Sequence, residues 1–323
     1  MGTPLTVGRF FERMRERLQL EQVPGADAPQ REIRSLNVSS PGLVLSGYVD
    51  RFPAQRIQVI GETEMAYLSS LSSSDRRTNL RVFFAFAIPC VVITKALQPT
   101  AEMIEEARAA GVPMFTSRLK THEFYSRIKP WLEDEFAPTA NLHGSLADVF
   151  GVGLLFIGRS GIGKSECVLD LVERGHRLVA DDLVLVKRRG SDLLIGRGHE
   201  LQRHHMEIRG IGLVDIPAIF GIRAVRQQKR IEVVVQLEEW HREAVVDRTG
   251  LDAESTTILE VDLPKVRVPL LPGKNITVIA EVIAMNHLLR YSGIDAAERF
   301  NERLIQQMRD SSAVRNYLQE DDE

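Results

Sequence analysis

An eight-residue loop near the middle of the sequence has the residue types of a phosphate-binding site. It fits the pattern G-x-x-x-x-G-K-[ST], with an apolar run before it and an amphipathic helical pattern after it. Glycines allow backbone N–H groups to surround phosphate oxygens, and the following helix adds its positive dipole end. A turn that only joins a strand to a helix would not need the Lys-Ser pair, so we expect Lys164 to contact the terminal phosphates and Ser165 to hold Mg²⁺. The loop residues are Gly158, Arg159, Ser160, Gly161, Ile162, Gly163, Lys164 and Ser165.

Other side chains in the second half of the chain have residue types that suit phosphoryl transfer. Asp181 and Asp182 end an expected strand, where parallel sheets place their ligand crevice. One carboxylate can orient Mg²⁺ and its neighbour can take a proton, although an acidic turn has the same sequence. His143 is equally readable as structural. Glu207 and Arg209 offer a carboxylate and a guanidinium beside glycines, or simply form a strand end and a turn.

The elements that position these residues can be read from apolar periodicity. The run 152–157 is continuously apolar, as in a strand buried on both faces. A helix that Gly175 ends follows the loop. Further strands are expected at 177–180, 183–187, 231–237 and 276–279, and helices at 281–291 and 296–309.

The first half predicts a separate small α/β domain without assignable chemistry. Strand-like and helix-like segments alternate over 33–129, which implies parallel strand pairing. An arginine-rich helix at 9–20 is interpreted as a solvated face. The expected strands are 56–60, 90–94 and 112–116, and the expected helices are 62–70, the segment capped by Thr100, and 119–136.

Composition limits the class of protein. With 323 residues, 44% hydrophobic and 26% charged, the chain suits about two soluble domains. The net charge of −3 lacks the basic balance of nucleic-acid-binding proteins. The most apolar stretch, 83–93, is shorter than the roughly 20 residues of a membrane helix, and no secretion signal is recognised. Cys90 and Cys167 match no paired spacing, so we expect reduced thiols in a cytoplasmic protein without nucleic-acid or membrane partners.

Several motifs across about 140–290 together resemble the bifunctional HPr kinase/phosphorylase family. They include longer matches than the phosphate loop alone, so the resemblance is specific for the second domain. The first domain is compatible with that family's smaller α/β domain, although its motifs are weak. The matching segments are 143–144, 151–153, 158–166, 175–182, 206–215, 247–250, 272–275, 281–282 and 284–286.

The resemblance implies an enzyme that phosphorylates a serine of the phosphocarrier protein HPr with ATP or pyrophosphate, and reverses this by phosphorolysis with inorganic phosphate. It places Lys164 and Ser165 at the phosphates and Mg²⁺, and Glu207 as a second metal-associated carboxylate. Asp182 matches the proton acceptor of the kinase direction and the donor of the reverse. His143 and Arg248 match active-site positions, and the family comparison also suggests a homohexamer.

Two departures from the family pattern are visible. Arg159 stands where the family commonly has an acidic residue, which changes the local charge but leaves the loop pattern intact. Leu271 and Lys274 stand where a family turn implicated in dephosphorylation has arginines. Leucine donates no hydrogen bond, and lysine offers a point charge instead of a planar fork. We therefore expect phosphorolysis to be weaker than the kinase reaction.

The resulting prediction is an α/β chain with an N-terminal α/β domain over 1–132, a linker over 133–139 and a phosphate-loop kinase domain over 140–323. By resemblance, the second domain is closer to phosphoenolpyruvate carboxykinase than to ordinary nucleotide kinases. Two alternatives remain: a small-molecule kinase or carboxykinase-like enzyme with the same cradle, and a nucleotide-binding regulator without catalytic geometry.

Overall fold

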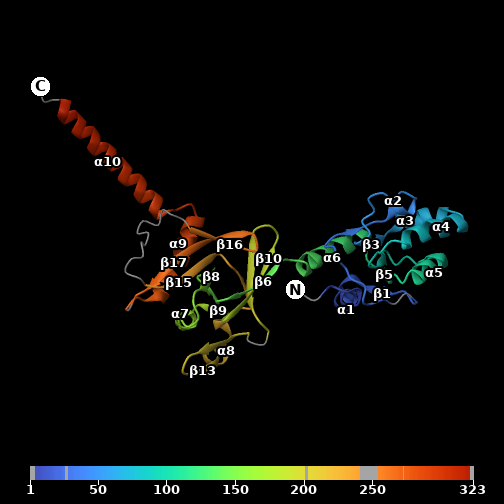
Figure 1. Cartoon of the computed structure of the whole chain (residues 1–323), viewed down its shortest axis with the longest axis horizontal. Helices are drawn as coiled ribbons and strands as arrows, with labels where there is room; N and C mark the ends of the chain where they lie inside the picture. Colours follow the sequence, from blue (N-terminus) through green and yellow to red (C-terminus); the bar gives the residue numbers. More distant parts are fainter. Residues whose placement is uncertain (1–3, 26–27, 201–202, 241–253, 272, 321–323) are drawn as a thin grey trace. The chain divides into compact units, whose positions relative to one another are not determined.

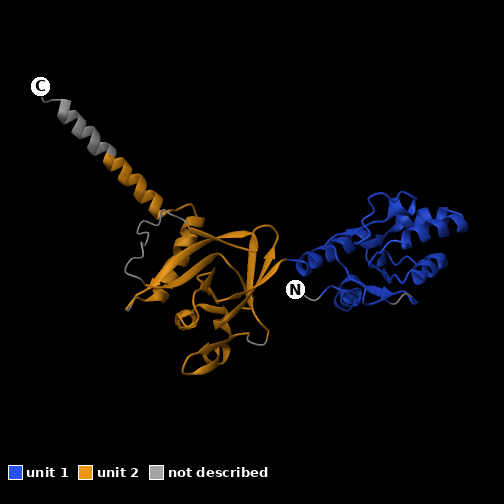
Figure 2. Ribbon diagram, viewed as in Figure 1, with its two compact units in different colours: residues 1–137 blue, residues 138–323 orange. Residues whose placement is uncertain are grey.

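The computed structural model describes residues 4–25, 28–200, 203–240, 254–271 and 273–320. The chain forms two compact units, whose boundary lies between Ala137 and Pro138 (Figure 2). Residues 133–135, expected in the linker, are the last turn of a helix that continues across Pro130. Buried Ile128 and Leu132 on either side of the proline hold this helix by packing, which offsets the lost backbone hydrogen bond.

The first unit is built on a five-stranded sheet in the order β1-β5-β4-β3-β2 (Figure 1). The pairs β2–β3, β3–β4 and β4–β5 are parallel, as the alternation of strands and helices predicted, whereas β1 is antiparallel to β5. The strands are β1 (Leu20–Gln22), β2 (Val38–Ser39), β3 (Ile57–Ile60), β4 (Val91–Ile93) and β5 (Met114–Ser117).

Helices cover both faces of this sheet. Val92 packs in the core under α1 and α6, whereas Val91 and Ile93 pack in the core under the helices α2 to α5. The arginine-rich helix α1 is amphipathic, with one apolar side buried and its arginines at least partly exposed. The helices are α1 (Val7–Leu18), α2 (Gly42–Leu45), α3 (Glu62–Ser70), α4 (Ser73–Phe84), α5 (Ala101–Ala109) and α6 (Thr121–Glu135).

The helix starts in this unit follow from local capping. The Thr100 hydroxyl accepts from the Met103 N–H at 3.3 Å, which confirms the predicted cap of α5. The Ser72 hydroxyl caps α4 in the same way, accepting from the Asp75 N–H at 3.2 Å. Helix α4 was not anticipated, because its apolar end at Phe83 reads as the start of the apolar run 83–93.

The second unit contains a six-stranded sheet in the order β16-β17-β15-β8-β7-β9, a four-stranded sheet in the order β14-β11-β10-β6 and the two-stranded β12-β13 (Figure 1). Among the described strands of this unit, only β8–β15 and β15–β17 pair in parallel. The strands are β6 (Thr139–His143), β7 (Ser145–Val149), β8 (Val152–Ile157), β9 (Arg177–Ala180), β10 (Leu183–Arg189), β11 (Leu193–Gly198), β12 (His205–Ile208), β13 (Gly212–Asp215), β14 (Gln228–Arg230), β15 (Val233–Glu239), β16 (Glu254–Ile258) and β17 (Val261–Leu270).

Strand β8 is buried on both faces, as its apolar run predicted. Leu154 and Phe156 pack with α7 and α9 residues in one core, and Leu155 packs with β10 and β11 residues in another. The six-stranded sheet therefore lies between helices on one face and the four-stranded sheet on the other. This burial fixes the strand that leads into the phosphate loop.

The prediction of a strand at 276–279 is wrong, because these residues form the first turn of α9. The Asn275 side chain accepts from the Val278 N–H at 3.1 Å and caps the helix. Burial of Ala280 and Ala284 against the sheet outweighs the strand preference of the β-branched residues. The helices of this unit are α7 (Lys164–Glu173), α8 (Ile216–Phe220), the 3₁₀ helix η1 (Ile222–Ala224), α9 (Ile276–Tyr291) and α10 (Ala296–Glu320).

Two expectations from composition concern cysteines and membranes. Cys90 and Cys167 are buried free thiols, and burial raises the pKa of Cys167 to about 12. Of the helices within the described ranges, none combines the length and the apolar character needed to cross a bilayer.

Candidate functional site

The strand directions of the six-stranded sheet bring three chain segments to one edge. Strands β8 and β9 flank β7 and are both antiparallel to it, so they run in the same direction. Their carboxyl ends, which lead to Gly158 and Asp181, meet at the edge where β7 begins with Ser145. The sheet is mixed and not parallel throughout, yet the carboxyl ends of β8 and β9 lie together, as we expected for neighbouring parallel strands.

The glycines of the phosphate loop are required by its backbone. A Cβ on Gly158 would lie 2.7 Å from the Leu237 carbonyl oxygen, and Gly161 and Gly163 have φ values of +75° and +105°. Gly163 is the N-cap of α7, and no side chain caps the first N–H groups of this helix. The loop thus presents backbone donors at a helix N-terminus, which suits a phosphate.

Lys164 is buried within the loop that it would serve. Its Nζ donates to the carbonyl oxygens of Gly158 at 3.1 Å and Arg159 at 2.9 Å, and the residue is only 6% exposed. The ammonium charge is therefore held inside the cradle. The Arg159 side chain is exposed and pairs with Glu239 at 2.9 Å.

Asp181 is the buried carboxylate of the site. Its Oδ1 accepts from the Ser145 hydroxyl at 2.5 Å and from the Ser165 hydroxyl at 3.0 Å. Its Oδ2 is buried without a hydrogen-bond partner among the described residues. Burial raises the pKa of Asp181, while the hydrogen bonds from both serines oppose that shift. A buried carboxylate oxygen without a donor, next to Ser165, suits a cation ligand.

Asp182 is the exposed carboxylate, and it lies beside His143. Strand β10 pairs with β6 so that Leu183 faces His143, and the Gly144 N–H donates to the Asp182 carbonyl at 3.1 Å. His143 Nδ1 makes a hydrogen bond with the Asp182 carbonyl oxygen at 3.0 Å and lies 3.1 Å from Asp182 Oδ1. Asp182 has a φ of 62°, which turns the chain sharply between β9 and β10. The two adjacent aspartates therefore face different surroundings.

Glu207 and Arg209 reach the site from the β12–β13 hairpin. Met206 and Ile208 are buried in the core that contains β8 and α7, so Glu207 between them is on the opposite side of the strand. The Arg209 guanidinium lies over Gly161, since a Cβ at that glycine would be 2.2 Å from its Nη2. The hairpin adds one acidic and one basic side chain to the phosphate loop.

A cavity of about 160 Å³ joins these groups. Five of the residues that line it were predicted from sequence as catalytic residues or as metal ligands, namely His143, Lys164, Ser165, Asp182 and Glu207. The residues lining the cavity are His143, Ser145, Ser160, Gly161, Gly163, Lys164, Ser165, Glu166, Asp181, Asp182, Glu207 and Arg209.

Some site residues were missed or lie outside the described chain. Arg248, predicted as catalytic, lies outside the described residues. Ser145 was not singled out, because only its position after His143-Gly144 marks it in the sequence. Asp181 was recognised as one of two adjacent aspartates, but the sequence does not show which of the two is buried.

The turn that carries Leu271 and Lys274 joins β17 to α9. The Lys274 N–H donates to the Leu271 carbonyl at 3.0 Å, and both residues are exposed. None of the described residues of this turn lines the cavity. Arg267, a neighbouring cation on β17, is held by Glu254 at 2.8 Å. Weakened phosphorolysis therefore stays a prediction.

A charged cluster links the end of the phosphate-loop helix to α9. Glu281 accepts two hydrogen bonds from Arg174, at 2.8 and 2.6 Å, and lies 3.0 Å from His176 Nε2. The hydrogen bonds from Arg174, supported by His176, lower the pKa of Glu281 to about 2, against the opposing effect of burial. The cluster fixes α7 at the end opposite to the phosphate loop.

The fold and site define a mixed α/β protein with a phosphate loop and a pair of unequal carboxylates. Residues 134–304 match the HPr serine kinase C-terminal domain, and residues 5–132 match the HPr serine kinase N terminus. The chain belongs to the HPr serine kinase family. This confirms the family predicted from the motifs and the predicted class of enzyme, a kinase/phosphorylase.

Named relatives agree with this membership, and one solved structure has a partial similarity to the chain. The HPr kinase/phosphorylase of Chloroherpeton thalassium is 44% identical over 317 residues, which cover 98% of this chain and 93% of that protein. That of Geobacillus kaustophilus is 41% identical over 297 residues, covering 92% and 96%. The Hpr(Ser) kinase/phosphatase structure from Coxiella burnetii is 29% identical, covers 47% of this chain and 99% of that chain, and has a TM-score of 0.44.

Proposed function

We propose that this chain transfers a phosphoryl group from ATP or pyrophosphate to a serine of HPr, and that it removes the group by phosphorolysis. The observation that carries the proposal is the single cavity in which Lys164, Asp181 and Asp182 meet, within a chain of the HPr serine kinase family. A nucleotide-binding protein without transfer activity would need the phosphate loop but not an exposed carboxylate beside it.

In the kinase direction, the serine oxygen attacks the terminal phosphorus of the donor and the bond to the bridging oxygen breaks. Asp182 accepts the proton of the serine hydroxyl, because its carboxylate is exposed beside the loop and within hydrogen-bond reach of His143. The charge of Lys164 and the N–H groups of α7 stabilise the negative charge that moves onto the leaving group. His143 holds the backbone of Asp182 through the carbonyl oxygen and lies beside its carboxylate.

In the reverse direction, an oxygen of inorganic phosphate attacks the phosphorus of phosphoserine. The bond between phosphorus and the serine oxygen breaks, and protonated Asp182 returns a proton to that oxygen, which gives HPr and pyrophosphate. Both directions use the same groups in opposite proton states, as microscopic reversibility requires.

The described residues fit a Mg²⁺ ion beside the loop. Asp181 has a buried oxygen without a donor among the described residues, and the Ser165 hydroxyl lies against its other oxygen. Ser165 and Glu207 would hold the ion, with the unpartnered oxygen of Asp181 as a further ligand, and the ion would neutralise phosphate charge. No group of three or more His, Cys, Asp or Glu side chains in the described chain forms a metal site alone. Phosphate oxygens and water are therefore expected to complete the shell.

Transfer of label from γ-³²P-ATP to purified HPr tests the proposal. Acid-stable label on HPr that phosphate releases as pyrophosphate is the expected result. Label in a small product would indicate a small-molecule kinase or a carboxykinase-like enzyme. Nucleotide binding without transfer to HPr would indicate a regulatory module and overturn the proposal.

The family resemblance supports further parts of the proposal. We propose a cytoplasmic homohexamer without nucleic-acid or membrane partners, whose second unit has a fold akin to phosphoenolpyruvate carboxykinase. Apolar side chains on α9 and α10 are exposed in the single chain, including Tyr291 at 85% and Phe300 at 68%, and assembly would cover such surfaces. Sedimentation of the full chain tests the assembly.

A further inference from the structure

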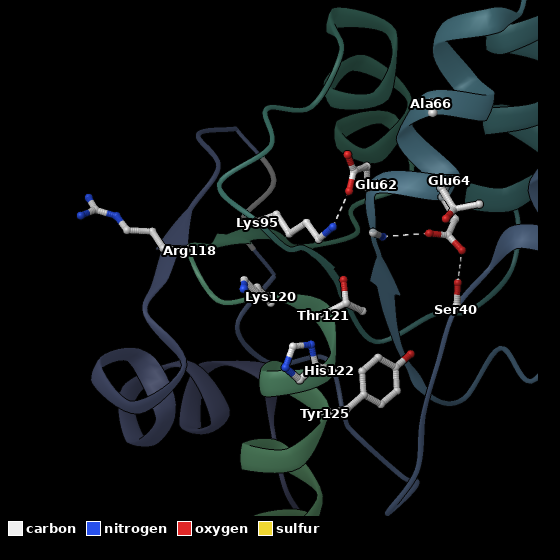
Figure 3. A pocket seen from close by; sticks show the side chains of 12 residues that line it. Ser40, Glu62, Glu64, Ala66, Lys95, Arg118, Lys120, Thr121, His122 and Tyr125 are labelled. Carbon is white, nitrogen blue, oxygen red and sulfur yellow. Dashed lines mark hydrogen bonds and ion pairs between the residues drawn. The ribbon is translucent and has the colours of Figure 1, made fainter.

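The first unit contains a cavity of about 1260 Å³ that phosphoryl transfer does not use (Figure 3). It lies at the carboxyl ends of β3, β4 and β5, where Gly61, Lys95 and Arg118 follow the strands. Because these strands are parallel, their ends meet at one edge of the sheet. Open α/β sheets bind ligands at this edge.

The chain changes sides of the sheet at this point. Helix α5, which follows β4, packs in the core on one face, whereas α6, which follows β5, packs in the core on the other. The two connections diverge and leave a crevice between the ends of β4 and β5. Such a switch in topology is the usual position of a ligand site in this class of fold.

The backbone around the crevice is held in an unusual conformation. Lys95 and Ala96 are consecutive non-glycine residues with φ values of 61° and 53°. Their N–H groups donate to the carbonyl oxygens of Leu119 at 2.8 Å and Ser117 at 2.9 Å, which ties the loop after β4 to the loop after β5. This conformation persists because its surroundings fix it, and it aims Lys95 along the crevice.

The cavity wall carries basic side chains of unequal availability. Lys95 pairs with Glu62, and Arg118 pairs with Glu21 at 2.7 Å. Lys120 is exposed and has no ion pair among the described residues. Figure 3 shows Lys95, Lys120 and His122 around one space, with Arg118 pointing away from it. A negatively charged ligand group could form an ion pair with Lys120, and Lys95 would lie in the same cavity.

Two helices begin at the cavity, and at each start a first-turn carboxylate accepts from the N-cap N–H, Glu64 from Gly61 at 2.9 Å and Glu123 from Lys120 at 3.3 Å. The N-cap of α3 is Gly61 and the N-cap of α6 is Lys120, and neither makes a side-chain cap hydrogen bond. The other long helices of the unit, α1, α4 and α5, are capped by threonine or serine hydroxyls. The N–H groups that follow these two N-caps therefore have no side-chain cap among the described residues and can donate to a ligand beside the basic side chains.

We propose that this cavity binds a small molecule that carries one phosphate group on a hydroxylated body. The phosphate would lie at the start of α6 between Lys120 and Lys95. The carboxylate of Glu62 and the tyrosine hydroxyl of Tyr125, which also line the cavity, suit ligand hydroxyls. The carboxylates of Glu62 and Glu64 in the wall disfavour a ligand with several phosphates.

The test uses the full chain and ribose 5-phosphate as the probe, with ribose and inorganic phosphate as comparisons. Calorimetric titration is made in the wild type and in Lys164→Ala, which weakens phosphate binding in the catalytic loop. Lys120→Gln removes the free charge, and Lys95→Asn removes the second with a residue that tolerates positive φ. Lys129→Gln is the matched control, because Lys129 is an exposed lysine of α6 outside the cavity.

We expect ribose 5-phosphate to bind equally in wild type and Lys164→Ala, and about tenfold more weakly in each cavity variant. Lys129→Gln should bind normally, and the probe should slow amine labelling of Lys120. Binding lost only in Lys164→Ala would place the ligand in the catalytic loop and overturn the proposal. Equal binding of ribose or of inorganic phosphate, or no binding at millimolar concentration, would also overturn it. None of these results depends on transfer to HPr.

Discussion

The two neighbouring aspartates provide the most discriminating experiment on the catalytic site. Both are conservatively replaced by asparagine, which keeps the shape and removes the charge. Asp181 is buried against Ser145 and Ser165, whereas Asp182 is exposed beside His143. The same substitution should therefore give two different defects.

Asp182→Asn should lower the maximal rate without affecting the fold. Its φ of 62° is one that asparagine adopts readily, and its side chain is 59% exposed, so no buried group loses a partner. The amide cannot accept the serine proton at neutral pH. Loss of a general base costs about 10²–10⁴-fold in rate, or about 2.7–5.4 kcal/mol in activation free energy. The Mg²⁺ requirement should not change.

Asp181→Asn should instead raise the Mg²⁺ concentration needed for half-maximal rate. The asparagine replaces the negative charge beside Ser165 with a neutral amide, which is a poorer partner for a cation site. Because burial already raises the pKa of Asp181, removing its charge should leave the free energy of unfolding unchanged or slightly higher. At saturating Mg²⁺ much of the rate should return.

The assay is HPr phosphorylation over a Mg²⁺ series, with binding of a fluorescent ATP analogue measured in parallel. Asp192→Asn is the matched control, because Asp192 is an exposed aspartate in the β10–β11 turn. The reasoning is refuted if Asp182→Asn retains the wild-type rate. It is also refuted if both variants show the same Mg²⁺ dependence, or if Asp181→Asn alone is inactive at saturating Mg²⁺.

Three further substitutions test separate parts of the second unit. Lys164→Ala should abolish detectable transfer, because it removes the charge inside the cradle. Glu281→Gln should lower the free energy of unfolding at neutral pH by about 2 kcal/mol, because it weakens the charged hydrogen bonds from Arg174. The pKa of Glu281 is lowered in the folded protein. The loss of free energy of unfolding in Glu281→Gln should therefore have its full size above about pH 4.5 and shrink as the pH falls towards 2. The double variant Leu271→Arg/Lys274→Arg should selectively raise the phosphorolysis rate.

Each of these results has a clear contrary outcome. Near-normal transfer by a folded Lys164→Ala protein would reject the phosphate-cradle assignment. For Glu281→Gln, unfolding of the second unit is followed by the fluorescence of the exposed Trp240, in a background where Trp131 is replaced by phenylalanine. If the free energies of unfolding of wild type and Glu281→Gln differ by the same amount at pH 6 and at pH 3, the titration argument is rejected. If the double arginine variant leaves an already fast reverse reaction unchanged, the Leu271 turn does not limit phosphorolysis.

Much of the candidate site could be predicted because its residues carry local signals. Gly158, Gly161 and Gly163 are required by backbone geometry within the loop itself, and Val152–Ile157 is apolar throughout because both faces are buried. Such constraints act over a few residues, so the sequence records them. The site was also expected at the carboxyl ends of β8 and β9. The antiparallel strand β7 that lies between them was not predicted.

The features that were missed depend on tertiary contacts. Nothing local distinguishes Asp181 from Asp182, and only the serines from β7 and α7 make the first one buried. The first turn of α9 is β-branched and reads as a strand, but Asn275 and the core beneath Ala280 make it helical. The contacts of Asp181 join residues far apart in the sequence. The Asn275 cap forms because packing of Ala280 makes the residues after it helical.

The arginine at position 159 can be reconciled with the phosphate loop through its partner. Arg159 extends from the loop to Glu239, the last residue of β15, and both side chains are more than half exposed. Water screens an exposed pair of this kind, so the pair contributes little to stability. Its effect is on charge: Glu239 offsets the added cation, and Lys164 stays the buried cation of the cradle. The departure from the family pattern therefore leaves in place the charge that we propose to face the phosphates.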